Sequence, residues 1–333
     1  MNATDPQRRQ FLGHATAMLA AAGAVPGLGS PAASASATPE RVVDRQSAAA
    51  ASGTLWIGGD LEVARLGFGA MRITGEGIWG EPASQTAARA VLRRAVDLGV
   101  NFIDTADSYG PDVSERLIGE ALHPYARGLL IATKGGLTRP GPNRWVADCR
   151  PEHLRAACEG SLKRLRTERI DLYQLHTPDS KVPYADSIGE LAKLQQEGKI
   201  RHIGISNVSV AQLEQARSLV KVVSVQNRYN VVDRGSEDVL EACEKAGIAF
   251  IPWGPLARRA PSTAGAASDS LSALEAIARE RGIGMPQATL AWLLAHSTVM
   301  LPIPGTGSID HLEENVAAAK LRLTVDELKR IGQ

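Results

Sequence analysis

The chain has 333 residues, of which 44% are hydrophobic and 22% are charged, and its formal net charge is +1. This composition is typical of an ordinary globular protein, and the balanced charge argues against the clustered basic surface that nucleic-acid binding needs. The cysteines (Cys149, Cys158 and Cys243) are odd in number and form no C-x-x-C pair, so we expect no disulfide framework and no zinc or other metal site.

Residues 1–50 differ in composition from the rest of the chain. Arg8-Arg9 precedes an uncharged, alanine-rich run from Phe11 to Val25, and Ala33–Ala37 contains two overlapping A-x-A cleavage sites. Basic, apolar and small-residue regions in this order are typical of a secretory signal, and the paired arginines resemble the twin-arginine type. The apolar run, about 15 residues long, is too short for a membrane span.

We therefore expect a signal peptide and a disordered linker over residues 1–50, with export to the periplasm by the twin-arginine machinery. No later segment approaches 18 uninterrupted apolar residues, so no membrane-spanning helix is expected. The alternative is a disordered N-terminal extension on a cytoplasmic protein.

From residue 54 the chain becomes a regular alternation of strands and helices. Thr54–Val63 indicates a hairpin around Gly58-Gly59. Short strands are predicted at Arg65–Gly69, 100–104, Leu129–Thr133, Ile170–Leu175, Ile200–Ile205, Val222–Gln226, Ile248–Pro252 and Val299–Ile303. Helices are predicted at Ser84–Leu98, 114–122, 151–165, Tyr184–Glu197, Val210–Leu219, Glu237–Ala246, Ser270–Arg281, Pro286–His296, Ile309–Ala319 and from Val325.

This alternation indicates an α/β fold with parallel strands, because parallel neighbours need crossover helices. Eight such units close a (β/α)8 TIM barrel. A doubly wound open sheet is the rival fold, but Gly67–Arg72 lacks the last glycine of a G-x-G-x-x-G turn. We predict one barrel over 54–333, with an N-terminal β-hairpin plug at its bottom and extra helices at its C-terminal end.

Four polar residues fall at or just beyond three successive strand ends. Asp104 ends the second strand and Tyr109 follows it, while Lys134 and His176 come directly after the third and fourth strands. The carboxyl ends of barrel strands share one face, which is where active sites of such barrels lie. Each residue alone has a structural explanation, such as a turn or a rim ion pair. Together they predict a catalytic site.

These residue types suit hydride transfer to a carbonyl group. A phenol can protonate the carbonyl oxygen if its pKa falls from about 10. A lysine ammonium beside Tyr109 would lower that pKa, and a carboxylate would keep Lys134 charged. A neutral His176 can polarise the carbonyl as a hydrogen-bond donor. We therefore assign Tyr109 as the acid and Asp104 as the anchor of Lys134.

Separated motifs resemble the aldo-keto reductase superfamily: F-I-D-T-A-x-x-Y-G, I-A-T-K, D-L-Y-Q-L-H, G-I-S-N-V and I-P-G-T-x-x-x-x-H-L-E-E-N. The resemblance spans roughly residues 54–333 and implies a β/α barrel that binds a nicotinamide dinucleotide without a Rossmann domain. It also implies that Asp104, Tyr109, Lys134 and His176 form the catalytic tetrad of an enzyme that reduces an aldehyde or ketone to an alcohol.

The resemblance implies a cofactor site as well. Ser206, Asn207 and Gln226 match residues that hold the nicotinamide carboxamide, and Trp253 matches an aromatic residue that stacks on the ring. A glycine-rich turn before a helix, as at residues 304–307, also offers free N–H groups to a phosphate. The full expected set is Gly69, Met71, Asp104, Ser206, Asn207, Gln226, Trp253, Gly254, Pro255, Leu256, Arg258, Ile303, Gly305, Thr306, Gly307, His311, Glu314 and Asn315.

The sequence departs from the family where the cofactor's 2′-phosphate would be read. Many members have lysine and arginine where this chain has Gly305 and His311. Arg258 could supply the missing charge, although it is equally a solvated loop residue. We expect NADP(H) as the cofactor, with NAD(H) as the alternative.

The resemblance implies a small carbonyl compound as the substrate. The segments Gly69–Arg72 and Gly77–Gly80 resemble bacterial pyridoxal reductase-like members, so Trp79 is expected at the barrel mouth, stacking on a flat aromatic aldehyde beside Tyr109 and His176. The alternative for Trp79 is a packed loop residue.

A different function is also open, because some barrels of this family are cofactor-binding, redox-sensing regulatory subunits of ion channels with little turnover. The physiological substrate, the reaction direction and the oligomeric state do not follow from the sequence.

Overall fold

The computed structural model describes residues 43–256 and 266–332. Arg8, Arg9 and the cleavage sites of the predicted signal lie outside the described residues, and so does Arg258. The barrel belongs to the unit Pro39–Gln333. No helix within the two described ranges is long and apolar enough to cross a membrane.

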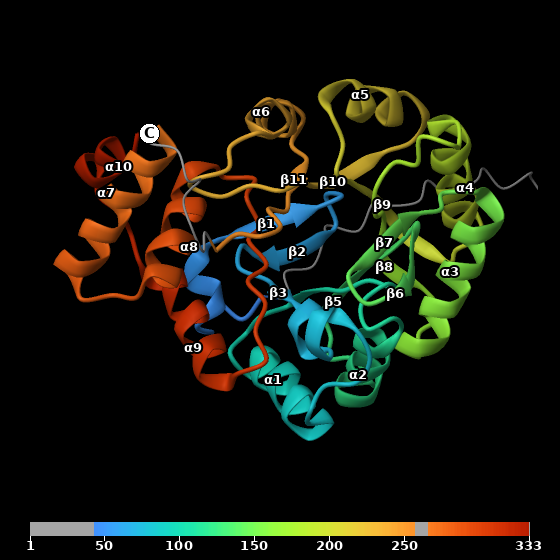
Figure 1. Cartoon of the computed structure of the whole chain (residues 1–333), viewed down its shortest axis with the longest axis horizontal. Coiled ribbons are helices and arrows are strands. Elements are labelled where there is room, and N and C mark those ends of the chain that lie inside the picture. Colours follow the sequence, from blue (N-terminus) through green and yellow to red (C-terminus); the bar gives the residue numbers. More distant parts are fainter. Residues whose placement is uncertain (1–42, 257–265, 333) are drawn as a thin grey trace, which may run out of the picture. The chain divides into compact units, whose positions relative to one another are not determined.

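The centre of this unit is a curved sheet of parallel strands, surrounded by helices (Figure 1). Its strands follow the chain order and lie side by side. They are β3 (Phe68–Gly69), β4 (Phe102–Asp104), β5 (Leu130–Gly135), β8 (Ile170–Leu175), β9 (Ile200–Ser206), β10 (Val222–Gln226) and β11 (Ala249–Phe250). Each of the seven coincides with a predicted strand, although the first, the second and the seventh are shorter than expected.

The predicted eighth strand closes the barrel between β11 and β3. The Phe250 N–H donates to the Val299 carbonyl at 2.9 Å, and the Leu301 N–H donates back to the Phe250 carbonyl at 2.8 Å. On the other side, the Gly67 N–H donates to the Pro302 carbonyl at 2.9 Å. Proline has no N–H to return, so this edge is paired in one direction only. The (β/α)8 barrel is therefore confirmed, with an irregular closing strand.

The outer helices also follow the prediction, with boundaries shifted by a few residues. They are α1 (Gln85–Asp97), α2 (Val113–Leu122), α3 (Pro151–Leu165), α4 (Tyr184–Gln196), α5 (Val210–Leu219), α6 (Glu237–Ala246), α7 (Ala266–Arg281), α8 (Met285–His296), α9 (Ile309–Ala317) and α10 (Val325–Ile331). Short 3-10 helices are η1 (Ala49–Ser52), η2 (Ala70–Ile73), η3 (Glu76–Ile78) and η4 (Ala318–Lys320). Side-chain caps begin several helices; Ser84, for example, accepts from the Ala87 N–H at 3.1 Å.

The predicted N-terminal hairpin forms and belongs to the core of the barrel. Strands β1 (Thr54–Ile57) and β2 (Leu61–Ala64) pair antiparallel. Ile57, Leu61 and Val63 join one buried cluster with inward-facing residues of the barrel strands, such as Phe102 and Leu172. Burial of these side chains removes apolar surface from water, which stabilises the closed end.

The predicted disordered linker is wrong for residues 43–50. Val43 and Ala49 are buried, and the Ala49 N–H donates to the Leu98 carbonyl at 3.1 Å. The Val43 N–H donates to the Glu62 carboxylate at 3.2 Å. This segment therefore packs on the barrel through small apolar side chains, whose low hydrophobicity made the sequence resemble a linker.

A second hairpin follows β5 and was not predicted. Strands β6 (Leu137–Gly141) and β7 (Arg144–Ala147) pair antiparallel around Pro142 and Asn143. Asn143 has a positive φ of 55°. This conformation suits the third residue of a four-residue turn whose second residue is proline, here Pro142. The P-N pair was the available sequence signal. This hairpin rises from the carboxyl end of a barrel strand, where it borders the candidate site.

Candidate active site

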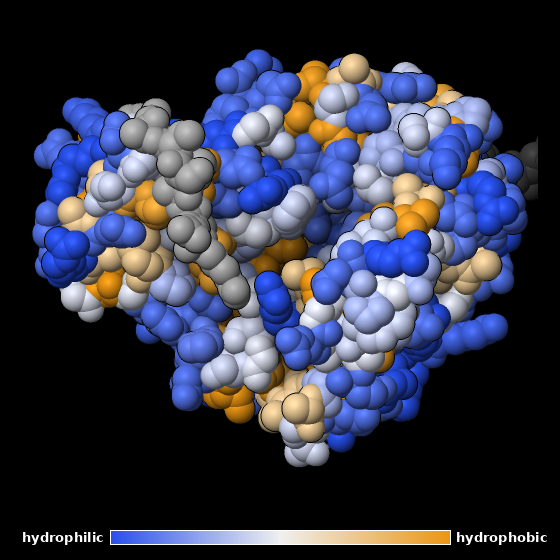
Figure 2. Space-filling view, viewed as in Figure 1, coloured by the Kyte–Doolittle hydropathy of each residue, from blue (hydrophilic) through white to orange (hydrophobic). Residues whose placement is uncertain are grey.

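A cavity of about 500 Å³ opens at the carboxyl ends of the barrel strands. Figure 2 shows the face of the protein seen in Figure 1, hollowed near its centre where hydrophobic and hydrophilic residues meet. The cavity is lined by Gly69, Met71, Arg72, Ile78, Asp104, Tyr109, Leu137, Trp145, His176, Ser206, Asn207, Gln226, Trp253, Gly254, Pro255, Leu256, Ile303, Pro304 and Gly305. Most of the predicted cofactor residues and three of the four predicted catalytic residues are in this set.

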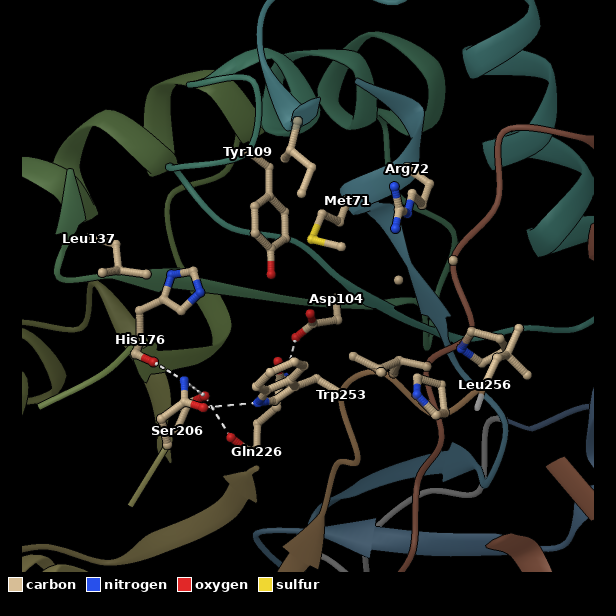
Figure 3. A pocket seen from close by; sticks show the side chains of 18 of the residues that line it. Met71, Arg72, Asp104, Tyr109, Leu137, His176, Ser206, Gln226, Trp253 and Leu256 are labelled. Atoms are coloured by element: carbon tan, nitrogen blue, oxygen red, sulfur yellow. Dashed lines mark hydrogen bonds between the residues drawn. The ribbon is translucent and has the colours of Figure 1, made fainter. Parts of the chain in front are cut away.

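The fourth predicted catalytic residue, Lys134, lies directly beneath the cavity. Its Nζ donates to Asp104 Oδ1 at 2.6 Å and to the Thr105 carbonyl at 2.8 Å, and it lies 3.5 Å from the Tyr109 hydroxyl. The Lys134 side chain is completely buried and that of Asp104 is 2% exposed. Neighbouring strands β4 and β5 bring them together, because parallel register aligns their carboxyl ends. In Figure 3 the Tyr109 side chain points towards Asp104.

The second oxygen of the Asp104 carboxylate also accepts hydrogen bonds. Oδ2 accepts from Gln226 Nε2 at 2.8 Å and from Gln174 Nε2 at 3.1 Å. Gln174 comes from β8, where it pairs in register with Lys134. The sequence analysis missed Gln174, although it stands in the D-L-Y-Q-L-H motif two residues before His176. A carboxylate that accepts hydrogen bonds at both oxygens is fixed in place and holds the ammonium in one position.

The charges of this group are set by burial and by each other. Burial alone lowers the pKa of the Lys134 ammonium, but the adjacent Asp104 carboxylate outweighs it, and that pKa is raised above its usual value. Burial raises the pKa of the Tyr109 phenol above its usual 10.0, and the Lys134 charge offsets this only in part. The expected net lowering of the Tyr109 pKa is therefore wrong for this state, because desolvation exceeds the attraction of a lysine 3.5 Å away. Tyr109 is a neutral phenol carrying its proton.

His176 is neutral as well. Burial, followed by repulsion from the Lys134 charge, holds the pKa of His176 well below its usual 6.5. Its Nδ1 lies 3.3 Å from the Ser108 hydroxyl, and its ring meets the Tyr109 ring edge-on at 5.8 Å between centroids. A Ser108 hydroxyl that donates to Nδ1 leaves the ring proton on Nε2. Ser108, which the sequence analysis also missed, thereby connects His176 to the loop that carries Tyr109.

Beside His176, an amide cluster lies at the ends of β9 and β10. Asn207, with a positive φ of 58°, donates from Nδ2 to the His176 carbonyl at 2.9 Å. Its Oδ1 accepts from the Trp253 indole N–H at 2.9 Å, and Ser206 donates to the Gln226 carbonyl at 2.6 Å (Figure 3). The indole of Trp253 is 37% exposed, which is unusual for so large a ring and leaves it available to a flat ligand.

The other end of the cavity is built from bare backbone. A Cβ on Gly69 would lie 2.6 Å from the Ile303 carbonyl, and a Cβ on Gly305 would lie 2.5 Å from the Gly69 carbonyl. Both distances are too short for a side chain, so glycine is required where the closing strand meets β3.

Five predicted cofactor residues do not line the cavity. They continue from Gly305 through the loop and into α9, and they are Thr306, Gly307, His311, Glu314 and Asn315. Thr306 and Asn315 are buried, whereas His311 is exposed at the first turn of the helix, where its N–H donates to the Ser308 hydroxyl at 3.5 Å.

The chain is also similar in sequence and in structure to known proteins. Residues 65–333 match the sequence model of the Aldo/keto reductase family. The chain belongs to the aldo/keto reductase family. It is similar to an uncharacterized oxidoreductase of Schizosaccharomyces pombe (49% identical over 285 residues, covering 86% of this chain and 90% of that one) and to pyridoxine 4-dehydrogenase of Escherichia coli (39% over 279 residues, covering 82% and 95%).

Among solved structures, this aldo/keto reductase resembles one from Klebsiella pneumoniae determined in complex with NADP and acetate. The TM-score is 0.68 and the sequences are 29% identical, over 84% of this chain and 93% of that one. The family membership and the fold together identify the chain as an oxidoreductase. Within residues 43–256 and 266–332, no group of His, Cys, Asp and Glu side chains is arranged to hold a metal ion.

At the substrate side of the aldo/keto reductase cavity, the structure places a different tryptophan from the expected one. Trp79 is not among the lining residues; it pairs through its backbone with Gly110 and packs near the Arg139 guanidinium. Trp145, from the unpredicted hairpin, lines the cavity instead and meets the Tyr109 ring edge-on at 6.3 Å. Trp145 could not be placed from sequence, because its position depends on how the hairpin folds back over the strand ends.

Proposed function

We propose that this aldo/keto reductase reduces an aldehyde or ketone to an alcohol with a nicotinamide dinucleotide as hydride donor. The observation that carries the proposal is the contact of one buried ammonium, Lys134 Nζ, with both Asp104 and the Tyr109 hydroxyl beneath an open cavity. Such a chain of groups has a chemical use only if the Tyr109 proton is transferred to something in the cavity.

The residues present fit a dinucleotide. The amides of Asn207 and Gln226 and the hydroxyl of Ser206 lie together beside the flat, exposed Trp253 ring, which suits a carboxamide-bearing aromatic ring. Gly69 and Gly305 line the same cavity and let two backbone segments approach closely at its edge. The loop then enters α9, whose N-terminal end carries a partial positive charge that favours a phosphate.

When bound, the dinucleotide supplies the hydride that adds to the carbonyl carbon. Tyr109 donates its phenolic proton to the carbonyl oxygen, and the Lys134 ammonium stabilises the phenolate that this leaves. Asp104 keeps Lys134 charged and oriented throughout. His176, neutral and carrying its proton on Nε2, donates a hydrogen bond to the same oxygen and polarises the carbonyl. The phenolate then regains a proton from water.

For the cofactor we propose NADP(H), with NAD(H) as the alternative. The support is the NADP bound to the Klebsiella pneumoniae relative and the presence of Arg72 near the glycine turn. Arg72 lines the cavity, and its Cγ would lie 3.6 Å from a Cβ at Gly305. Arg258, which lies outside the described residues, remains a proposed contact to the 2′-phosphate. Gly305 itself offers only its N–H group.

For the substrate we propose a flat aromatic aldehyde of the pyridoxal type. The support is the similarity to pyridoxine 4-dehydrogenase and the half-exposed Trp145 ring beside Tyr109 and His176. An aromatic substrate could stack on or against this ring.

We also propose export by the twin-arginine route, supported by Arg8-Arg9, the apolar run and the cleavage sites in the sequence.

The test is NADPH consumption by the purified full chain with pyridoxal, 4-nitrobenzaldehyde and propanal, alongside NADPH binding measured by fluorescence. We expect turnover with at least one aldehyde, and faster turnover with the aromatic ones. Tight cofactor binding without turnover on any aldehyde would favour a redox-sensing regulatory subunit instead. Failure to bind either dinucleotide would refute both the reductase function and the redox-sensing function.

A further inference from the structure

The β6–β7 hairpin contains a buried arginine whose guanidinium is surrounded by backbone carbonyls. Arg139 is only 8% exposed. Its Nε donates to the Arg144 carbonyl at 3.0 Å, and its Nη1 donates to the carbonyls of Ile78 and Ser108, both at 3.0 Å. Nη2 lies 3.4 Å from the Gly77 carbonyl. These acceptors come from three separate segments: the hairpin itself, η3 and the loop that carries Tyr109.

The same guanidinium stacks on tryptophan. Its Cζ lies 3.6 Å from the centroid of the Trp145 ring and 5.6 Å from that of Trp79. Cation–π contact at the shorter distance orients the indole as well as attracting it. Trp145 in turn meets the rings of Tyr109 and His176 edge-on, at 6.3 and 6.5 Å between centroids. The stack therefore ends at the two groups proposed to act on the carbonyl oxygen.

This arrangement is costly for a residue that only holds a hairpin. Every hydrogen-bond acceptor that Arg139 finds within the described chain is a neutral carbonyl, so no carboxylate offsets the desolvation of its charge. A hairpin could be held at lower cost by apolar packing. A planar, five-donor group is required only if several backbone segments and an aromatic ring must be held in one fixed relation.

We infer that Arg139 is a positioning residue. It holds Trp145, which forms the wall of the cavity on the substrate side, in a fixed relation to the loop that bears Tyr109. One face of its guanidinium sets the angle of Trp145, while its hydrogen bond to the Ser108 carbonyl fixes the loop bearing Tyr109. The Ser108 hydroxyl extends the same connection to His176 Nδ1 at 3.3 Å. This makes Arg139 a determinant of selectivity for flat aromatic carbonyl compounds. The inference rests on the proposed carbonyl reduction.

The decisive comparison is between Arg139→Ala and Arg144→Ala in the full chain. Arg144 is the matched control, because it lies in the same hairpin with an exposed side chain, and alanine retains the carbonyl that Arg139 uses. For 4-nitrobenzaldehyde we expect Arg139→Ala to lower kcat/KM by about tenfold to a hundredfold, the effect of a small misplacement of reacting groups. For propanal, which is too small to use the Trp145 wall, we expect a smaller loss that falls on kcat alone. Arg144→Ala should match the parent.

NADPH affinity separates positioning from general damage. Arg139 contacts none of the amide cluster at Ser206 and Asn207, so the affinity of Arg139→Ala for NADPH should stay within about twofold of the parent. Arg139→Lys keeps the charge but loses the planar stack, so its kcat/KM for 4-nitrobenzaldehyde should lie between those of the parent and Arg139→Ala. If Arg139→Ala does not fold, Arg139→Lys takes its place in the comparison. Equal losses on both aldehydes, a parallel loss of NADPH affinity, or parent-like kinetics would overturn the inference.

A double variant tests whether Arg139 acts through Trp145. If it does, Arg139→Ala combined with Trp145→Ala should lose no more selectivity between the two aldehydes than Trp145→Ala alone. If the loss of selectivity in the double variant equals the product of the losses in the two single variants, the two residues act independently. That result would overturn the role assigned to the stack.

One readout needs no turnover and so separates this inference from the proposed function. The near-ultraviolet circular dichroism of Trp145 is obtained as the difference between the parent and its Trp145→Phe variant. The same difference measured in the Arg139→Ala background should be strongly reduced, because the indole is no longer held at one angle. An unchanged difference would overturn the inference even if every aldehyde is reduced. A reduced difference in a protein that reduces none would sustain the positioning role and refute only the proposed reaction.

Discussion

The Lys134 ammonium lies 2.6 Å from the Asp104 carboxylate, and neither side chain is more than 2% exposed. Removing one member of a buried pair leaves the other as an uncompensated charge, which costs about 3–5 kcal/mol. We therefore expect Asp104→Ala to lower the free energy of unfolding by about that amount. Adding Lys134→Met should restore part of the loss, because the stranded ammonium is then absent. Urea unfolding of the parent, both single variants and the double variant measures this; a double variant less stable than Asp104→Ala would contradict it.

The Tyr109 hydroxyl is the proposed proton donor, so its removal should affect chemistry and leave binding intact. Tyr109→Phe keeps the ring that meets His176 and Trp145 edge-on. Carbonyl reduction should fall by about 10²–10⁴-fold, the usual contribution of a general acid. NADPH affinity, measured in parallel by fluorescence, should be nearly unchanged. Retention of near-parent turnover would show that another group supplies the proton.

The pH dependence of reduction follows from the two shifted pKa values. Because the pKa of Tyr109 is raised above 10.0, the phenol stays protonated and able to donate up to at least that pH. Because the pKa of His176 is held well below 6.5, the imidazole stays neutral down to below that pH. We expect kcat/KM to be level between pH 6.5 and 10 and to fall only outside that range. A fall in kcat/KM centred near pH 6.5 would mean that His176 is solvated. A fall centred near pH 8 would mean that the Lys134 charge lowers the pKa of Tyr109 by more than burial raises it.

The choice between the two dinucleotides should depend on arginine near the cofactor's adenosine end. If Arg258 reads a 2′-phosphate, Arg258→Ala should weaken NADPH binding by about 10–150-fold, since a charge-assisted contact contributes about 1.5–3 kcal/mol. NADH, which has no such phosphate, should bind as before. Lys245→Ala, a surface variant on α6, controls for net charge. Equal weakening of both dinucleotides would make Arg258 a structural residue or a pyrophosphate contact.

Export can be decided by fractionating cells that express the native chain or its Arg8→Lys, Arg9→Lys variant. A pathway that moves folded proteins would let the enzyme leave the cytoplasm with its cofactor bound, which a threaded chain could not do. The native protein should appear outside the cytoplasm, shortened to begin near Ser36 or Thr38, and the variant should stay inside at full length. If both remain in the cytoplasm uncleaved, residues 1–50 are not an export signal.

Much of the fold and most of the catalytic group followed from the sequence because both are encoded locally. Strands of this barrel are short, their helices return the chain at once, and successive strands become neighbours. Asp104, Lys134 and His176 stand at the ends of adjacent strands, so knowing the order of elements was enough to bring them together. The predicted hairpin at Thr54–Val63 was equally local, since its turn and its two strands are contiguous.

Other properties were decided only by tertiary structure. The pKa of Tyr109 depends on burial against a lysine 3.5 Å away, and that balance is a sum over contacts from different strands. Trp145, rather than Trp79, lines the cavity, and it stacks on Arg139, which is bound by carbonyls of its own hairpin and of two segments distant in sequence. Gly305 has no room for a side chain, because the closing strand approaches the Gly69 carbonyl too closely. Each depends on distances between parts of the chain that no local pattern specifies.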